Sequence, residues 1–564
     1  MIARASRYFH TLRHLRLRQW TGRAWHALPK PRPGAAPTPL RHVFEGDWAA
    51  PLWREPSLVG PAEFRFAQQT RSVRAHADWR PTDVSDLWLY NLHYFDDLNA
   101  ADAGSRGGWH RAWIESWIAG NPVGVGRGWD PYPTSLRMVN WVRWALRRGK
   151  LPVQAVASLA TQARWLERRL ETHLLGNHLW SNAKALCFVG AFFEGDDADR
   201  WLRTGLRLLG EELDAQRLPD GGHFERSPMY HGLFLEDALD LLQLARLRPA
   251  AFPAGWPAAL AESAGRMLDW MGHLVHPDGD IAFFNDSTLG ICPPLRKLAV
   301  YAALLDVPVR GEPVHRSPLP HAGLRHLQPS GFLRLQGAGA TLFADVGGVG
   351  PDHLPGHAHA GTLSFELSLG GARMVVNGGV SVYGTGPERQ RQRGSRAHST
   401  LVVDGEDSSE VWAGFRVARR ARVVATGARE GADDVLFWAV HDGYRRLAGS
   451  PLHKRTWRLG AGGLLIEDAV TGSGRHRLEI LLHLAPGWSA QPEGTDAVRF
   501  RASAPSADVE DIVLHFQPPF EAVIEAGTWH PRFGVSERSE SVALRATVDL
   551  PVTHQTRISW RNAA

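Results

Sequence analysis

Cysteine is nearly absent from this chain, since only Cys187 and Cys292 occur among its 564 residues. Two cysteines over this length exclude a disulfide framework and a cysteine-based metal site. Long apolar runs are missing too: no stretch reaches the roughly 18 apolar residues of a transmembrane helix. The whole chain is 44% hydrophobic and 22% charged, an ordinary globular composition. The length is too great for one compact core, so we expect at least two domains.

The first acidic residue of the chain is Glu45, so the N-terminal segment before it carries none. The segment is rich in arginine and has no continuous apolar stretch, so the sequence predicts no Sec signal peptide and leaves the compartment open. We favour a basic helix that packs on the protein over a helix that contacts a membrane surface or polyanion. The net charge of +6 likewise favours an acidic partner, whether nucleic acid, anionic glycan or membrane.

Helical spacing dominates the chain from about residue 45 to 310, as in ATQARWLERRLETHLL, where apolar residues recur at i, i+3 and i+4. Short polar and aromatic inserts interrupt the helices, beginning at Trp129, Gly176, Asp220 and Asp278. Each step between inserts fits about two helices of 11–12 residues. The spacing therefore predicts a curved or closed array of helical hairpins, with the inserts lining one cleft.

Strand patterning replaces helical spacing from about residue 325 onward. Segments such as GFLRLQGAGATLFADVG and KRTWRLGAGGLLIEDAVTG alternate apolar and polar residues between glycine-rich turns. This pattern predicts a large antiparallel sandwich. We therefore predict a multidomain α+β chain with a basic arm over 1–45, an incomplete (α/α) toroid over 46–315 and an antiparallel β-sandwich over 316–564.

The segment GNHLWSNAKAL, residues 176–186, has two different faces at helical spacing. Asn177, His178, Ser181 and Asn182 fall on one side, and Leu179, Ala183 and Leu186 on the other. A solvated face is the simplest interpretation. Such faces usually carry Lys and Glu, however, whereas amide, hydroxyl and imidazole groups are poor helix formers that donate hydrogen bonds. Lys184 is expected to be no more than a charge at the rim.

A helix start is indicated in LPDGGHFERSPMYHGLFLEDAL by Ser227 followed by Pro228. Tyr230 then lies in the first helical turn, where the positive helix end favours a phenolate and lowers the pKa. The alternative is a core tyrosine whose hydroxyl is hydrogen-bonded.

Histidines and arginines cluster between residues 352 and 400. His357 and His359 are two residues apart, so on a strand both would face one side. Together with His398 and either Asn377 or Asp352 they are a candidate zinc site, although H-x-H alone is a weak signal. The stretch PERQRQRGSR, near Tyr383, carries Arg389, Arg391, Arg393 and Arg396. It suits either an anionic substrate or a solvated loop.

Four of these segments, GNHLWSNAKAL, DGGHFERSPMYH, GHAHAGTLSFEL and RAHSTLVVDG, resemble in this order the heparinase II/III-like polysaccharide lyases. The resemblance extends from about residue 85 to 480. It implies the same toroid-and-sandwich fold and cleavage of a uronic-acid glycan by β-elimination. It implies catalytic roles for five residues: Asn177 as the amide that neutralises the carboxylate, His178 beside it, Tyr230 as acid or shared acid and base, His357 reaching in from the sandwich, and Tyr383 as a second tyrosine.

The remaining site predictions concern substrate and metal. Arg137, Glu225, Arg389 and Arg393 are the predicted substrate-binding residues. His359, Asn377 and His398 match positions that bind a structural zinc ion in some relatives, but an aspartate is expected where Asn377 stands, and Gly361 replaces an expected acid. Because a neutral amide is a poorer zinc ligand, no cofactor is predicted to be required, and a structural zinc ion is kept as an alternative.

We therefore predict a carbon–oxygen lyase that acts on an anionic polysaccharide, such as an exopolysaccharide or a glycosaminoglycan-like polymer. No nucleic-acid partner is expected, and membrane contact through the basic arm stays an option. Three alternatives are open: a uronate C5-epimerase, a glycoside hydrolase, and a non-catalytic glycan-binding protein of polymer assembly. The hydrolase would use Glu225 with Asp220 or Glu236 as its carboxyl pair.

Overall fold

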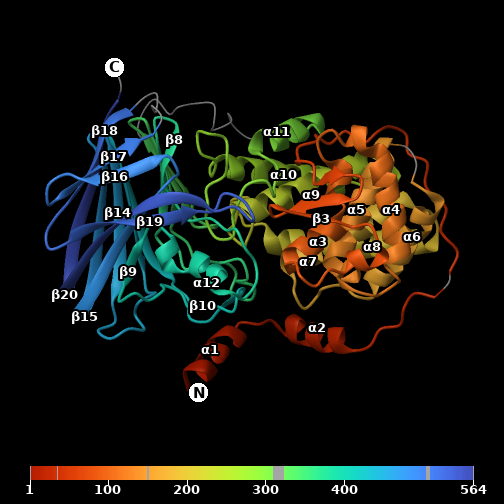
Figure 1. Ribbon diagram of the computed structural model, residues 1–564, viewed down its shortest axis with the longest axis horizontal. Helices are drawn as coiled ribbons and strands as arrows, with labels where there is room; N and C mark the ends of the chain where they lie inside the picture. Colours follow the sequence, from red (N-terminus) through yellow and green to blue (C-terminus); the bar gives the residue numbers. More distant parts are fainter. Residues whose placement is uncertain (1, 35, 149–150, 309–322, 504–508, 563–564) are drawn as a thin grey trace.

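Helices and strands fill separate halves of the chain (Figure 1). The computed structural model describes residues 2–34, 36–148, 151–308, 323–503 and 509–562. The last helix of the first half ends at Leu304, and the first strand of the large sheet begins at Gly323. The chain is thus an α-helical region followed by an antiparallel β region, as the sequence predicted. The predicted boundary between 315 and 316 lies outside the described residues.

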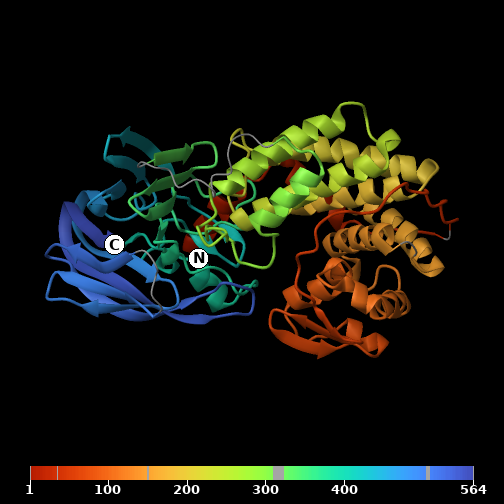
Figure 2. The same cartoon turned by 90° about the horizontal axis from the view of Figure 1, so that it is seen from above.

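The helical region consists of helices packed side by side (Figure 2). They are α3 (Asp86–Tyr94), α4 (Gly107–Gly120), α5 (Pro131–Arg148), α6 (Val153–Glu167), α7 (Gly176–Phe192), α8 (Asp196–Gln216), α9 (Pro228–Leu247), α10 (Trp256–Gly272) and α11 (Leu295–Leu304). α7 packs against α5, α8 and α9 and is buried along almost its whole length. It is therefore the central helix of the region rather than one with a solvated face.

Local sequence explains where two of these helices begin. α8 has Asp196, Asp197 and Asp199 in its first turn, where carboxylates complement the positive helix end. The Ser227 hydroxyl accepts a hydrogen bond from the Tyr230 backbone N–H over 3.1 Å, and Pro228 opens α9. The helix start predicted from Ser-Pro is confirmed, because such a cap satisfies one of the N–H groups that a helix end leaves unpaired.

Two smaller pieces precede the helical region. The N-terminal arm forms α1 (Ile2–Leu12) and α2 (Leu17–Ala27), which lie along the lower edge of the molecule in Figure 1. A small antiparallel sheet follows, made of β1 (Leu58–Gly60), β2 (Glu63–Phe66) and β3 (Gln69–Ser72). Among the described helices, none is long and apolar enough to cross a membrane.

The β region is one antiparallel hydrogen-bonded network, which joins 15 strands within the described residues. The strands are β4 (Gly323–Leu327), β5 (Phe332–Gly337), β6 (Ala340–Asp345), β7 (Phe365–Leu369), β8 (Ala372–Val376), β9 (Leu401–Val403), β12 (Val423–Glu430), β13 (Asp434–His441), β14 (Leu452–Gly460), β15 (Gly463–Leu484), β16 (Trp488–Pro492), β17 (Ala497–Ala502), β18 (Val509–Phe516), β19 (Glu521–Trp529) and β20 (Glu537–Asn562). Burial alternates along β13, as one covered sheet face requires.

The long strands β15 and β20 pair with each other and tie the network together. One end of β15 pairs with β14, and its other end pairs with β8 and β9. Apolar side chains of these strands form a core separate from that of the helices. Between β8 and β12 the chain leaves the network twice: before β9 it forms α12 (Pro387–Arg393), and after β9 it forms the hairpin β10–β11 (Val411–Trp412, Arg416–Val417). These excursions face the helical region.

Candidate active site

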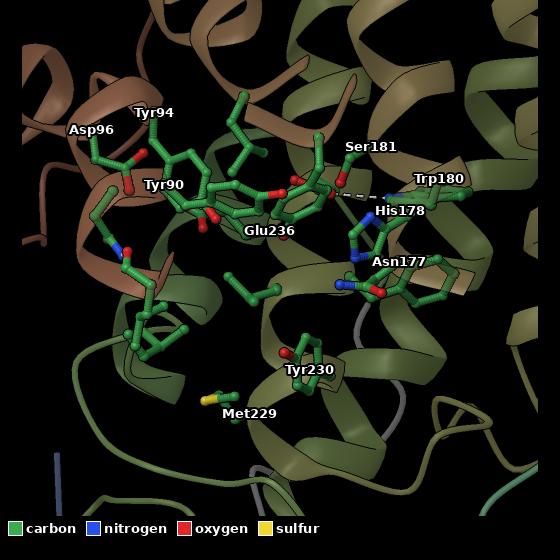
Figure 3. A pocket seen from close by; sticks show the side chains of 18 of the residues that line it. Tyr90, Tyr94, Asp96, Asn177, His178, Trp180, Ser181, Met229, Tyr230 and Glu236 are labelled. Atoms are coloured by element: carbon green, nitrogen blue, oxygen red, sulfur yellow. Dashed lines mark hydrogen bonds between the residues drawn. The ribbon is translucent and has the colours of Figure 1, made fainter. Parts of the chain in front are cut away.

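A cavity of about 610 Å³ lies where the helical region meets the loops of the β region. Helices α3, α5, α7 and α9 form one wall, and loops of the β region complete it. The five residues with predicted catalytic roles all line this cavity: Asn177, His178, Tyr230, His357 and Tyr383. The volume falls within the usual range of ligand pockets. Figure 3 shows Asn177 and His178 of α7 and Tyr230 of α9 facing the same space.

Asn177 and His178 reach the cavity because the chain turns sharply just before them. Leu175 and Gly176 both have a positive φ, at 63° and 56°. A Cβ atom on Gly176 would lie 2.4 Å from the side chain of Leu354 and 3.1 Å from that of Glu225. A larger residue here would strain the backbone and displace these side chains, so glycine lets the first turn of α7 approach the loop of the β region closely.

His178 is held from behind by a carboxylate. Its Nδ1 lies 3.0 Å from the Glu171 carboxylate, and its ring packs at a tilt against the ring of Tyr132, with centroids 4.5 Å apart. Asn182 donates to the other Glu171 oxygen over 3.1 Å and accepts the Glu171 backbone N–H over 2.8 Å. Burial alone would lower the pKa of His178, but the attraction of Glu171 outweighs it and raises the pKa.

Tyr230 forms the opposite side of the site. Its ring lies parallel to the His357 imidazole, with centroids 3.8 Å apart, and its hydroxyl is 3.0 Å from the Tyr383 hydroxyl. Burial, together with the neighbouring Tyr383 and Asp286, raises the pKa of Tyr230 well above its usual value. The expectation that the helix end would lower this pKa is wrong, because the cost of burying a phenolate is the larger effect.

His357 is oriented by Glu225, whose carboxylate is in contact with Nδ1 of the ring. Glu225 is only 2% exposed, and its attraction to His357 outweighs burial and lowers the pKa of the carboxyl. Because Nδ1 contacts Glu225, Nε2 is the ring nitrogen on the side of the cavity. His357 and His359 do not share a strand face, because they lie in a loop: His359 binds Asp286 instead.

The three predicted substrate-binding arginines are buried, and their guanidinium groups are bound by the protein. Arg137 donates to the Gly128 carbonyl oxygen, and Arg393 to that of Ala358. Arg389 binds Asp286 through both terminal nitrogens and lies 5.0 Å from the ring of Tyr383. Within the described residues none of the three lines the cavity, so their contact with substrate stays a prediction.

The predicted zinc ligands form a pair of histidines rather than a complete site. Nδ1 of His359 is 3.1 Å from Nε2 of His398, and the Asn377 side chain accepts from Ser399 over 3.3 Å. No group of three or more His, Cys, Asp or Glu side chains among the described residues could hold a metal ion. Two imidazoles and a neutral amide fall short of the three or four good donors that a structural zinc ion takes. The donor set does not fit this metal.

Cations on the cavity wall are neutralised by nearby acids. Lys184 contacts Asp237 at 2.5 Å and Asp240 at 2.6 Å, and its side chain is 5% exposed. The expectation of a rim charge is therefore wrong, because two carboxylates stabilise this ammonium group inside the wall. Arg54 likewise lies 3.8 Å from Asp96 and 3.6 Å from Glu236.

Sequence reasoning missed Glu171 and Tyr132, which hold the His178 ring. Glu171 lies in the connection between α6 and α7, where no periodic pattern marks it. Its proximity to His178 depends on the tight turn at Gly176. Asn182, left without a role by the sequence, was the available signal, because a fully buried amide must find hydrogen-bond partners.

Comparison with known sequences identifies relatives of both halves. Residues 150–299 match the sequence profile of the heparinase II/III N-terminus, and residues 319–561 match that of the heparinase II/III-like C-terminal region. The heparin-sulfate lyase of Pedobacter heparinus is 24% identical over 330 residues, which are 53% of this chain and 48% of the relative. FtsZ-localized protein C of Caulobacter vibrioides is 29% identical over 308 residues, 52% of this chain and 48% of the relative. The chain spans about half the length of these curated relatives.

Solved structures show the same arrangement of regions. Heparinase III superposes with a TM-score of 0.69 at 18% identity, covering 87% of this chain and 80% of that one. A chondroitinase AC lyase superposes with a TM-score of 0.51 at 10% identity, covering 85% and 77%. These likenesses establish a shared fold of an α-helical region and a β-sandwich.

Proposed function

Because the chain belongs to the heparinase II/III-like family, we propose that it is a polysaccharide lyase that cleaves a uronic-acid-containing glycan by β-elimination. The observation that carries the proposal is the convergence, in one cavity, of an amide and an imidazole from α7 with the paired Tyr230 and His357. The curated relatives named heparin-sulfate lyases support a glycosaminoglycan or a similar anionic polymer as substrate.

The first requirement of the reaction is to mask the charge of the uronate carboxylate. Removing the C5 proton places negative charge on that carboxylate, so donors aimed at it stabilise the transition state more than the bound substrate. In the proposed mechanism Asn177 and His178, which line the cavity, donate these hydrogen bonds. Glu171 supports the protonated form of His178, which would then also neutralise charge.

The second requirement is a base for the C5 proton and an acid for O4. His357 takes the C5 proton on Nε2, while Glu225 holds the Nδ1–H and stabilises the imidazolium that forms. The electron pair of the C5–H bond becomes the C4–C5 double bond as the C4–O4 bond breaks. Tyr230, protonated because of its raised pKa, gives its proton to O4, and Tyr383 supports its hydroxyl. Proton transfer from His357 through solvent restores the phenol.

We further propose that the helical hairpins close into an incomplete (α/α) toroid over 46–315, followed by the sandwich domain over 316–564. Such an arrangement would bring the inserts of the helical region to one end, where the cavity lies. We also propose that the lyase activity is linked to exopolysaccharide metabolism.

A glycoside hydrolase is the less favoured alternative, because its carboxyl pair must flank the scissile bond. Glu225 is bound to His357, and Asp220 accepts two hydrogen bonds from Ser330. Glu236 accepts from Trp53 over 2.9 Å. A C5-epimerase would use the same proton abstraction but would return a proton to the opposite face of C5 and leave the C4–O4 bond intact.

The test is an assay of heparan sulfate, heparosan, hyaluronan and alginate for the ultraviolet absorbance of an unsaturated uronate product. Growth of that band supports the lyase. New reducing ends without the band would indicate a hydrolase, and solvent deuterium at C5 of an uncut chain would indicate an epimerase. Binding without any product would indicate a glycan-binding protein.

A further inference from the structure

The N-terminal helices are attached to the rest of the protein by one side only. On α1, the Tyr8 ring meets Trp412 edge-on, with centroids 5.0 Å apart, and Thr11 accepts a hydrogen bond from the Trp412 indole over 3.1 Å. On α2, Gln19 is 1% exposed and donates to the His353 carbonyl oxygen over 3.0 Å. These contacts fix which sides of the two helices face outward.

Gly22 strengthens the attachment of α2. A Cβ atom at this position would lie 2.9 Å from the backbone nitrogen of His173, so the helix touches the helical region directly. Gln19 and Gly22, three residues apart, define the inner face of α2. The arm is therefore docked in a defined orientation, with α1 beneath the β region and α2 beneath the helical region (Figure 1).

The outer face of α2 is apolar. Leu17 and Trp20 are three residues apart on α2, so they share one side, opposite Gln19 and Gly22, and Leu28 follows directly after the helix. They are 77%, 47% and 56% exposed. An amphipathic helix of a globular protein normally turns such a face to the core. Here the polar side faces the protein and the apolar side faces solvent.

Cations accompany these apolar side chains. No acidic residue precedes Glu45, whereas arginines recur throughout the arm. The guanidinium of Arg13 lies 5.9 Å from the ring of Phe9, itself 62% exposed, and that of Arg23 lies 6.0 Å from the ring of Trp20. Within the described part of the chain, no carboxylate lies within ion-pair distance of Arg13 or Arg23. The face thus combines apolar groups with unneutralised positive charge.

We propose that this outer face of the arm binds the surface of an anionic phospholipid membrane. Leucine and tryptophan side chains would enter the boundary between headgroups and acyl chains, and the arginines would contact lipid phosphates. A polyanionic glycan or nucleic acid would use the arginines, but it offers nothing to Leu17 and Leu28. The proposal is independent of the reaction in the cavity.

Vesicle co-sedimentation of the full chain tests this proposal. The protein should bind vesicles of phosphatidylcholine with about one-third phosphatidylglycerol, but not pure phosphatidylcholine, and binding should weaken at about 0.5 M salt. The variant L17S/W20S/L28S should bind at least about tenfold more weakly. The matched control V153S/V300S/V424S removes three exposed apolar residues elsewhere and should bind like the native protein.

A second measurement keeps the proposal testable if the triple variant is unstable. Leu17→Cys can be labelled selectively with an environment-sensitive dye, because Cys187 and Cys292 are buried. The dye emission should shift to the blue when the anionic vesicles are added. Absence of vesicle binding by the native protein, or equal binding by the triple variant, would overturn the proposal. Two other results would also overturn it. One is an unshifted dye emission together with arginine-dependent binding to heparin alone. The other is self-association of the native protein that the triple variant abolishes.

Discussion

Replacing Glu225 by glutamine is the sharpest single perturbation of the proposed chemistry. In the proposed mechanism the native carboxylate accepts the Nδ1 proton of His357, and Nε2 is the base that faces the cavity. The glutamine amide has the same shape, but its NH₂ group can donate to Nδ1 and stabilise the other tautomer, with the proton on Nε2. The base is then blocked, although the ring stays in place.

The size of the effect follows from this loss of the correct tautomer. Exchanging the carboxylate partner of a catalytic histidine for an amide costs about 10⁴-fold in turnover in the best-studied triads. We therefore expect kcat/KM to fall by about 10³- to 10⁴-fold, which is about 4–5.5 kcal/mol of transition-state stabilisation. Thermal stability should change little, because the substitution is isosteric and Glu225 is already closely packed.

The assay is the initial rate of unsaturated product formation at saturating and limiting substrate. Glu479→Gln is the matched control, since Glu479 is a buried carboxylate of the β region that pairs with Arg396 and Arg545 away from the cavity. Its activity should stay within about threefold of the native value, because Glu479 does not line the cavity. Native kcat/KM in Glu225→Gln would refute the assignment of His357 as the base.

Three further outcomes are expected. In Glu171→Gln, the pKa of His178 should fall because the attraction that raises it is lost. KM should therefore begin to rise at a lower pH than in the native protein, and kcat should change less. Profiles of KM against pH check this. Asn177→Asp should lower kcat/KM at least about 10³-fold, because a carboxylate would face the substrate carboxylate; steady-state kinetics check this, with Asn177→Ala expected to lose less. Gly176→Ala should destabilise the fold by about 1–3 kcal/mol, because an alanine there strains the backbone and meets Leu354; denaturant unfolding checks this, and an unchanged midpoint would contradict it.

The sequence predicted those parts of the fold that local patterns specify. The Ser227–Pro228 cap, the helical spacing of residues 176–186 and the alternation of KRTWRLG along β14 each appear in the structure. These features depend on neighbouring residues, so they can be read from spacing alone. The two-region organisation follows from the change between the two periodicities near residue 325.

Contacts between distant segments could not be predicted in the same way. Glu225 was expected to bind substrate, and the structure places it against His357, which is 132 residues away. Arg389 was predicted at the substrate, yet its counterion is Asp286, which no motif marked. Lys184 is buried because Asp237 and Asp240 of α9 lie beside it. Each of these outcomes depends on packing between elements, which periodicity does not encode.

Tyr230→Phe tests the central claim most directly. Native protein and variant are incubated with the uronate polymer that yields the unsaturated product, and absorbance of that product is followed, with Tyr444→Phe as a control for loss of a buried tyrosine hydroxyl outside the cavity. We predict that the native protein and Tyr444→Phe form the product, whereas Tyr230→Phe, correctly folded, forms none above background. Full activity in Tyr230→Phe would contradict the proposed mechanism.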